Sequence, residues 1–212
     1  MAKVKICGIT NIKDALEASK LGADFVGFLV EICFAEDKVT RKEAKDIIKK
    51  LPLEVSAVFV TYLQKAEPII KIAKEIDPAI IQLHNDISLE EIGKIRKNLK
   101  GMQITKTIGV VDKSSIKEAK KYEKYVDYLL LDTKVKGKKG GTGKTHDWSI
   151  SAEIIKSVKR KVFLAGGLDP DNVQESVSKV NPFAVDTNNG VKKKARLKDH
   201  DKMKKFIERA KK

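Results

Sequence analysis

The stretch LLLDT (Leu129–Thr133) is an apolar, strand-like run that delivers a carboxylate to its C-terminal end. A Lys/Gly-rich loop follows it and ends in GGTG (Gly140–Gly143). Glycines let backbone N–H groups approach an anion closely, and such a nest of dipoles favours phosphate. An acid beside a phosphate grip indicates proton-transfer chemistry on a phosphorylated small molecule. The alternative interpretation is a buried strand followed by an ordinary surface loop.

Two later strand-like runs end in a similar way. Val162–Ala165 runs into Gly166 and Gly167, and Phe183–Asp186 runs into the polar turn Thr187–Gly190. A pair of glycines alone is weak support, because glycine also serves ordinary turns between strands and helices. In a (β/α)8 barrel, however, the loops after the seventh and eighth strands frequently form a phosphate site. Three successive strand ends of this kind favour the functional interpretation.

Strand-like and helical patterns alternate along the whole chain, at a spacing close to one βα unit. Several runs are almost continuously apolar, which is typical of parallel strands covered by helices. The alternation predicts a (β/α)8 TIM barrel with a parallel eight-stranded sheet, formed as a single domain over residues 1–212. A doubly wound open sheet is the alternative. The strand-like runs are Lys3–Cys7, Phe25–Val30, Val55–Val60, Ala79–Leu83, Gln103–Thr107, Tyr128–Asp132, Val162–Ala165 and Phe183–Asp186.

Helix start signals lie between the runs. Thr40–Glu43 and Ser88–Glu91 both have the pattern of a capping box. Asp169 followed by Pro170 predicts an N-cap and a first-turn proline. Asp147 is expected to cap the helix that follows the glycine-rich loop.

The composition, with 42% hydrophobic and 34% charged residues, is that of a soluble globular protein. No apolar run is long enough to span a bilayer, no signal peptide pattern is present, and two cysteines are too few for a disulfide scaffold. We therefore expect a cytoplasmic protein with no membrane partner, either a monomer or a homodimer. The net charge of +15 raises the question of nucleic acid. Because zinc-finger and RNA-binding motifs are lacking, nucleic acid is not the expected partner.

Three chemically active side chains are expected at one mouth of the barrel. Cys7, Asp132 and Asp186 end the first, sixth and eighth runs, and the C-terminal ends of barrel strands converge at the active face. A lone cysteine is more often a small core residue, but the position of Cys7 directly before Gly8 favours a base or nucleophile. His84, which ends the fourth run, is interpreted as a structural hydrogen-bonding residue. No metal-ligand spacing is present.

In these motifs the chain resembles the phosphoribosylanthranilate isomerase family, nearly over its whole length and in the same order. The resemblance implies a (β/α)8 barrel enzyme of tryptophan biosynthesis that acts without metal or cofactor. It implies the Amadori rearrangement of a small phosphorylated substrate, N-(5′-phosphoribosyl)anthranilate, to 1-(2-carboxyphenylamino)-1-deoxyribulose 5-phosphate. The matching segments are Lys5–Thr10, Gln82–His84, Leu131–Thr133, Gly140–Gly143, Ala165–Leu168, Val185–Asp186 and Gly190–Val191.

The resemblance also implies a role for each site residue. Asp132 would protonate the ring oxygen of the sugar as general acid, and Cys7 would remove the proton from carbon 2 as general base. Asp186 would lie near the sugar. Backbone groups would hold the phosphate at Gly141, Thr142, Gly143, Gly166, Gly167, Asn189 and Gly190.

Two segments depart from the family pattern. After the second strand the family usually carries Ser-Pro-Arg, whose Arg meets the anthranilate carboxylate, whereas this chain has Asp37 in that stretch. Lys38 and Arg41 are the candidate replacements for that cation, although a Lys lacks the bidentate fork of Arg. The alternative is that Lys38 merely faces solvent. After the last strand, Lys192 stands where the family usually has Glu and adds positive charge near the site.

Two other functions stay open at this point. The first keeps the fold and chemistry but acts on another phosphorylated aminosugar that lacks the anthranilate carboxylate. The second is a non-catalytic paralogue that binds a phosphorylated metabolite or RNA through its basic surface. The presence of both an acid and a base argues against the second.

Overall fold

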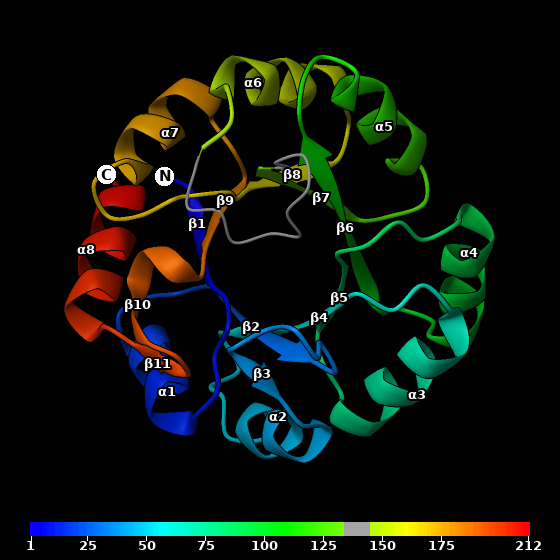
Figure 1. The fold of residues 1–212 in the computed structure, drawn as a ribbon, viewed down its shortest axis with the longest axis horizontal. Coiled ribbons are helices and arrows are strands. Elements are labelled where there is room, and N and C mark those ends of the chain that lie inside the picture. The colour runs from blue at the N-terminus through cyan, green and yellow to red at the C-terminus, as the bar shows by residue number, and fades with distance from the viewer. Residues whose placement is uncertain (134–144) are drawn as a thin grey trace.

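A closed parallel barrel forms the centre of the protein, as the computed structural model shows for the residues it describes, 1–133 and 145–212. Each strand pairs in parallel with the next, and the last returns to pair with the first. The predicted (β/α)8 barrel is thereby confirmed (Figure 1). Its strands are β1 (Lys3–Ile6), β2 (Phe25–Val30), β4 (Ser56–Thr61), β5 (Ile80–Leu83), β6 (Gln103–Val110), β7 (Tyr128–Thr133), β8 (Lys161–Leu164) and β9 (Ala184–Thr187).

Helices form a ring around the barrel, one after each strand (Figure 1). Short elements are added at two places: β3 (Lys38–Val39) lies parallel to β2, and β10 (Lys192–Lys194) pairs antiparallel with β11 (Leu197–Lys198) after the 3-10 turn η1 (Asn189–Val191). The helices are α1 (Ile12–Lys20), α2 (Arg41–Ile48), α3 (Ala66–Ile76), α4 (Leu89–Asn98), α5 (Ser115–Tyr122), α6 (Trp148–Ser157), α7 (Val173–Val180) and α8 (His200–Ala210).

Most of the predicted helix starts are confirmed. Thr40 and Glu43 form the reciprocal capping box at α2, and the Asp147 carboxylate accepts the Ser149 N–H at the start of α6. Ser88 caps α4, but the carboxylate of Glu91 does not return to it. Glu91 instead accepts the N–H of Ala66 at 2.6 Å, so this side chain links α4 to the start of α3.

The prediction for α7 is wrong in its starting point. This helix begins at Val173 after the N-cap Asn172, and not at Pro170. The Asp169 carboxylate accepts the N–H groups of Asp171 at 2.8 Å and Asn172 at 3.1 Å. The Asp-Pro signal therefore stabilises a turn that precedes the helix.

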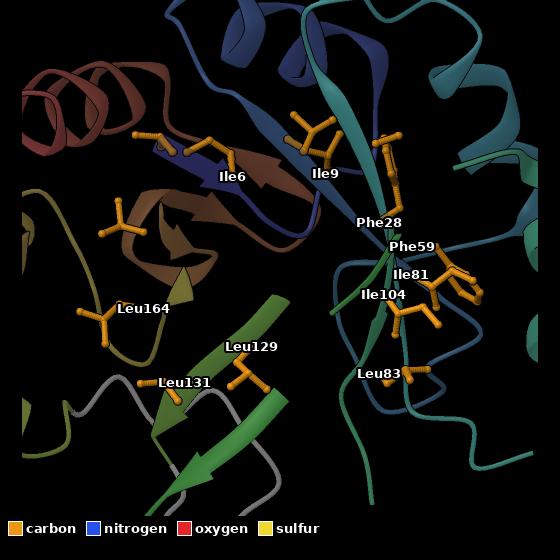
Figure 2. Packing of buried hydrophobic residues seen from close by; sticks show 14 of the residues in the cluster. Ile6, Ile9, Phe28, Phe59, Ile81, Leu83, Ile104, Leu129, Leu131 and Leu164 are labelled. Carbon is orange, nitrogen blue, oxygen red and sulfur yellow. The ribbon is translucent and has the colours of Figure 1, made fainter. Parts of the chain in front are cut away.

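The core has two layers because side chains alternate between the two faces of each strand. The outer layer fills the space between strands and helices, and Figure 2 shows part of it, including Ile6, Phe28 and Leu129. These three side chains are completely buried. Complete burial of such side chains contributes about 1.5–3 kcal/mol each.

The inner layer fills the barrel itself and changes in character along the axis. Toward the start of the strands it is aromatic, with the rings of Phe25 and Phe163 5.1 Å apart and those of Tyr128 and Phe183 stacked at 5.8 Å. Toward the C-terminal ends the inward positions become polar. On β7, for example, Leu130 belongs to the inner core and Asp132, two residues later, lines the mouth. The aromatic side chains therefore fill one end of the barrel, and the polar side chains line the other end.

In the described part of the chain, no helix is both long enough and apolar enough to cross a membrane.

Candidate active site

A cavity of about 600 Å³ opens at the C-terminal ends of the strands. Cys7, Asp132 and Asp186 all line it, so the structure brings together the three strand-end residues that the sequence singled out. The cavity is also lined by four of the predicted phosphate contacts, Gly166, Gly167, Asn189 and Gly190. The other three, Gly141, Thr142 and Gly143, lie outside the described residues.

Cys7 follows β1 directly and is 7% exposed. Its N–H donates to the carbonyl of Thr187 at 2.8 Å, which fixes the end of β1 against β9. A Cβ at Gly27 on β2 would lie 2.8 Å from the Cys7 Sγ, so the thiol occupies space that only a glycine leaves open. Burial raises the pKa of the Cys7 thiol, and the nearby ammonium of Lys5 acts in the opposite direction.

Lys5 is a buried cation in the middle of β1, with 1% of its side chain exposed. Its Nζ donates to the Asp186 Oδ2 at 2.8 Å and to the Gln82 Oε1 at 2.7 Å. Burial alone would lower the pKa of Lys5, but Asp186 and Cys7 outweigh it and the pKa is raised. Lys5 therefore stays protonated and supplies the positive charge that a Cys7 thiolate needs.

Asp186 is held by one oxygen only. Its Oδ2 accepts from Lys5, whereas its buried Oδ1 has no hydrogen-bond partner among residues 1–133 and 145–212. A buried acceptor without a partner is costly. Asp186 also lines the cavity, which places its carboxylate beside any bound sugar.

Asp132 binds a proton more readily than an ordinary aspartate does. Its Oδ1 accepts the N–H of Thr133 at 2.8 Å, and its Oδ2 lies 3.5 Å from the His84 Nε2. Burial, followed by repulsion from Asp186, raises the pKa of Asp132 to about 6. An aspartate with this pKa can act as a general acid at physiological pH.

His84 is neutral, because burial and the charges of Lys5 and Lys106 lower its pKa to about 3. The Gln82 Oε1 accepts from Lys5, so the Gln82 Nε2 is the atom that faces the His84 Nδ1, at 3.1 Å. An amide nitrogen donates, so Nδ1 accepts and the ring proton resides on Nε2, which faces Asp132. A chain of polar groups thus runs from Lys5 through Gln82 and His84 to Asp132.

The sequence alone does not predict Lys5 and Gln82 as site residues, and it predicts only a structural role for His84. A signal is nevertheless present, because the residues of each pair, Lys5–Cys7 and Gln82–His84, lie two positions apart at the end of a strand, with one residue between them. Residues at this spacing share a face. A polar pair at the end of an otherwise apolar barrel strand therefore indicates inward-facing groups.

An aromatic wall borders the cavity beside Asp132. The ring of Tyr62 lies 5.0 Å from that of Phe34, edge to face, and 4.7 Å from that of His84. Phe34 is 53% exposed. The hydroxyl of Tyr62 stays neutral, because burial and the charges of Asp132 and Cys7 raise its pKa. The wall offers an apolar surface for a planar group.

The glycine loops after β8 and β9 have conformations that require glycine. Gly166 and Gly167 have φ angles of +88° and +71°, a region that residues with side chains rarely adopt. A Cβ at Gly166 would collide with Thr133, and one at Gly190 with the Leu168 carbonyl. Bare backbone therefore faces the cavity at these loops, as an anion site requires.

Lys38 and Arg41 are not brought to this cavity. The Lys38 Nζ donates to the Cys33 carbonyl at 3.0 Å, and Arg41 binds Glu31 and Glu75 at 2.5 and 3.2 Å. The backbone of β3 continues the sheet beside β2 and directs the chain into α2, away from the mouth. Lys192 lines the cavity instead.

A metal site requires several ligating side chains close together. Within 1–133 and 145–212, no group of three or more His, Cys, Asp or Glu side chains is arranged to hold a metal ion.

Comparison with known proteins connects this cavity to one family. The family model for N-(5'phosphoribosyl)anthranilate (PRA) isomerase matches residues 4–209. N-(5'-phosphoribosyl)anthranilate isomerase 2 of Methanosarcina mazei is 38% identical over 212 residues, which cover 99% of this chain and 94% of the relative.

Solved structures agree with the sequence comparison. The phosphoribosyl anthranilate isomerase from Thermotoga maritima superposes with a TM-score of 0.90 at 36% identity, covering 100% of this chain and 99% of the other. A phosphoribosyl anthranilate isomerase in complex with reduced 1-(o-carboxyphenylamino)-1-deoxyribulose 5-phosphate superposes with a TM-score of 0.87 at 34% identity and the same coverage. The chain therefore belongs to the N-(5'-phosphoribosyl)anthranilate isomerase family.

Proposed function

We propose that this chain catalyses the Amadori rearrangement of N-(5′-phosphoribosyl)anthranilate, with Cys7 as general base and Asp132 as general acid. The observation that carries the assignment of roles is that a buried thiol beside a lysine and a carboxyl group with a pKa of about 6 line the same cavity. These groups come from different strands, β1 and β7, so a substrate can lie between them.

The cavity suggests an orientation for the substrate. The phosphate would lie against the glycine loops after β8 and β9, where backbone is exposed to the cavity. Asp186 would lie beside the ribose. The aromatic ring of anthranilate would pack against the wall of Phe34 and Tyr62. Carbon 1, carbon 2 and the ring oxygen then lie in the middle, between acid and base.

The first step opens the ribose ring. Asp132 donates its proton to the ring oxygen, the bond from that oxygen to carbon 1 breaks, and the nitrogen lone pair forms a protonated Schiff base. The resulting Asp132 carboxylate keeps its hydrogen bond from the Thr133 N–H and faces the Nε2–H of neutral His84. Neutral donors of this kind stabilise the carboxylate without holding it as firmly as a cation would.

The second step moves the proton from carbon 2. The Cys7 thiolate removes this proton, and the electron pair of the C–H bond forms the double bond of an enolamine while the iminium nitrogen becomes neutral. The positive charge of Lys5 stabilises the thiolate beforehand. Protonation at carbon 1 and loss of the carbon 2 hydroxyl proton then give the ketone, so that atoms and charge balance over the reaction.

The productive protonation state is a minor one. Near neutral pH the raised pKa of Cys7 favours the thiol, and Asp132, with a pKa of about 6, is mostly ionised. Catalysis requires the opposite arrangement, thiolate and carboxylic acid, which has the same total number of protons. The two forms interconvert without uptake of a proton from solvent, so activity follows the population of the singly protonated pair.

The test is turnover of freshly generated N-(5′-phosphoribosyl)anthranilate, followed by the loss of its fluorescence. We expect rapid turnover by the wild type and loss of most activity in both Cys7→Ala and Asp132→Asn. A folded wild-type protein without turnover would refute the proposed reaction. Turnover that persists in either variant at the wild-type rate would refute the role given to that residue.

A further inference from the structure

One cationic side chain faces the cavity in the part of the chain that the structure describes. Of the described Lys and Arg residues, only Lys192 lines the cavity, and its side chain is 19% exposed. It comes from β10, just after the glycine loop of β9. A substrate that carries a carboxylate as well as a phosphate needs a cation at each anion or a nest of N–H groups. Lys192 is therefore the candidate partner for the second anion.

Two carboxylates already contact Lys192, and they differ sharply in their surroundings. Asp37 lies 2.8 Å from the Lys192 Nζ, is 2% exposed and also accepts the backbone N–H of Arg196 at 2.9 Å. Glu36 lies 3.3 Å from the same Nζ, but its side chain is 71% exposed at the rim. Asp37 is a fixed partner that positions Lys192, whereas Glu36 is a loosely held partner that can leave.

The charge state of Lys192 agrees with this arrangement. Burial alone would lower the pKa of Lys192, but Asp37 and then Glu36 outweigh this effect and raise it. The ammonium group therefore remains charged when a ligand fills the cavity. Asp37 and Lys192 are also the two departures from the family pattern noted in the sequence, and the structure joins them in one ion pair.

The apolar surroundings locate the carboxylate. The segment that supplies Glu36 and Asp37 also supplies Ile32 and Phe34 to the cavity wall. An aromatic ring packed on Phe34 therefore presents its substituents to the same segment. In anthranilate the carboxylate is ortho to the nitrogen, so it projects from the edge of the ring beside the sugar. A ring on this wall can direct that carboxylate to Lys192.

We infer that Lys192 binds the carboxylate of the anthranilate ring by exchanging Glu36 for it, and thereby selects a substrate that carries this carboxylate. The inference rests on the proposed function and assigns its aromatic subsite. The exchange leaves Lys192 with the same number of anionic partners, and Asp37 holds the ammonium in position throughout. Glu36 covers the ammonium in the empty site and competes with the substrate for it.

The experiment compares two substrates, N-(5′-phosphoribosyl)anthranilate and N-(5′-phosphoribosyl)aniline, which lacks the carboxylate. Lys192→Gln should lower kcat/KM for the anthranilate compound roughly 10- to 100-fold, the range expected for a lost hydrogen bond between charged groups. The loss should appear mainly in KM, because the contact is equally present in the ground state and the transition state. The preference for the anthranilate compound over the aniline compound should fall by a similar factor.

Matched variants separate this role from a structural one. Lys193→Gln removes the same charge from the next, exposed residue of β10 and should leave the preference unchanged. Lys192→Arg should restore most of it. The double variant Asp37→Asn/Lys192→Gln also removes the buried Asp37 carboxylate, which Lys192→Gln alone would leave without a cation. It should lose the preference for the anthranilate compound to the same extent as Lys192→Gln. Glu36→Gln should lower KM for the anthranilate compound because the competing carboxylate is gone.

Two results would overturn the inference. One is a Lys192→Gln enzyme that keeps the wild-type preference between the two substrates. The other is an equal loss of activity on both substrates in Lys192→Gln and in the double variant, since that would mean a structural role. Turnover of neither substrate by the wild type would refute the proposed function itself and this inference with it.

Discussion

Asp132→Asn should abolish catalysis and, at the same time, stabilise the folded protein. Burial and repulsion from Asp186 raise the pKa of Asp132 from its ordinary value of 3.8 to about 6. A group whose pKa is raised on folding binds protons more tightly in the folded state. Ionising it at neutral pH therefore lowers the free energy of unfolding. Asparagine removes this cost and can still accept the N–H of Thr133.

The magnitude follows from the two pKa values. Each tenfold change in proton affinity corresponds to about 1.4 kcal/mol, so the shift to about 6 corresponds to roughly 3 kcal/mol at most. The Asp132 side chain is 22% exposed, so water screens part of this energy, and we expect ~1–3 kcal/mol. For a chain of this size the corresponding rise in Tm is roughly 3–10 °C.

The sign of the effect gives a pH signature. Below about pH 4 Asp132 is protonated in both the folded and unfolded states, so the variant and the wild type should be equally stable. As the pH rises from about 4 to 6, the wild type loses stability relative to Asp132→Asn. Above that range the difference should be constant.

Urea unfolding of both proteins, repeated across this pH range, measures the difference. Asp46→Asn, at an exposed aspartate on α2, is the matched control and should change the free energy of unfolding by less than about 0.5 kcal/mol. A variant that is less stable than the wild type at pH 8, or a gain that does not vary with pH, would refute the reasoning.

Three further predictions follow from the site. The value of kcat/KM should fall below about pH 6, where the Cys7–Asp132 pair takes up a second proton. A kcat/KM that does not change between pH 5 and pH 7 would contradict this. Gln82→Leu should lower kcat roughly 10-fold or more by releasing the His84 ring from its fixed tautomer; unchanged kcat and pH profile in steady-state kinetics would contradict it. Gly166→Ala should destabilise the protein by more than Gly101→Ala in thermal unfolding, because both positions have positive φ but only Gly166 would collide with a neighbour; equal losses would argue against that collision.

Much of the fold could be predicted from local patterns. Apolar runs such as Leu129–Leu131 specify buried parallel strands, and capping residues such as Thr40 specify where helices begin. The proximity of Cys7, Asp132 and Asp186 could also be predicted, because the C-terminal ends of all barrel strands converge at one face. These predictions depend only on the order of strands and helices along the chain, which can be inferred from the sequence pattern.

Contacts between distant segments were not predictable in the same way. The Lys192–Glu36 contact joins residues 156 positions apart, and nothing local to Lys192 indicates its partners. Lys38 and Arg41 lie near Asp37 in sequence, but β3 and its pairing with β2 lead them away from the cavity. The chain of contacts from Lys5 to Gln82 likewise crosses the inside of the barrel and depends on which side chains meet there.

The most direct test of the central claim is the fate of the carbon 2 proton. Single turnovers of substrate carrying deuterium at carbon 2 should be slower than those of ordinary substrate in the wild type. In Cys7→Ser, whose hydroxyl ionises far less readily than the thiol, the reaction should be slower still and keep a primary isotope effect. In Cys7→Ala, with Asp132 intact, removal of this proton should stop. Cys7→Ala turning over deuterated and ordinary substrate at wild-type rates would contradict the assignment of Cys7 as the base.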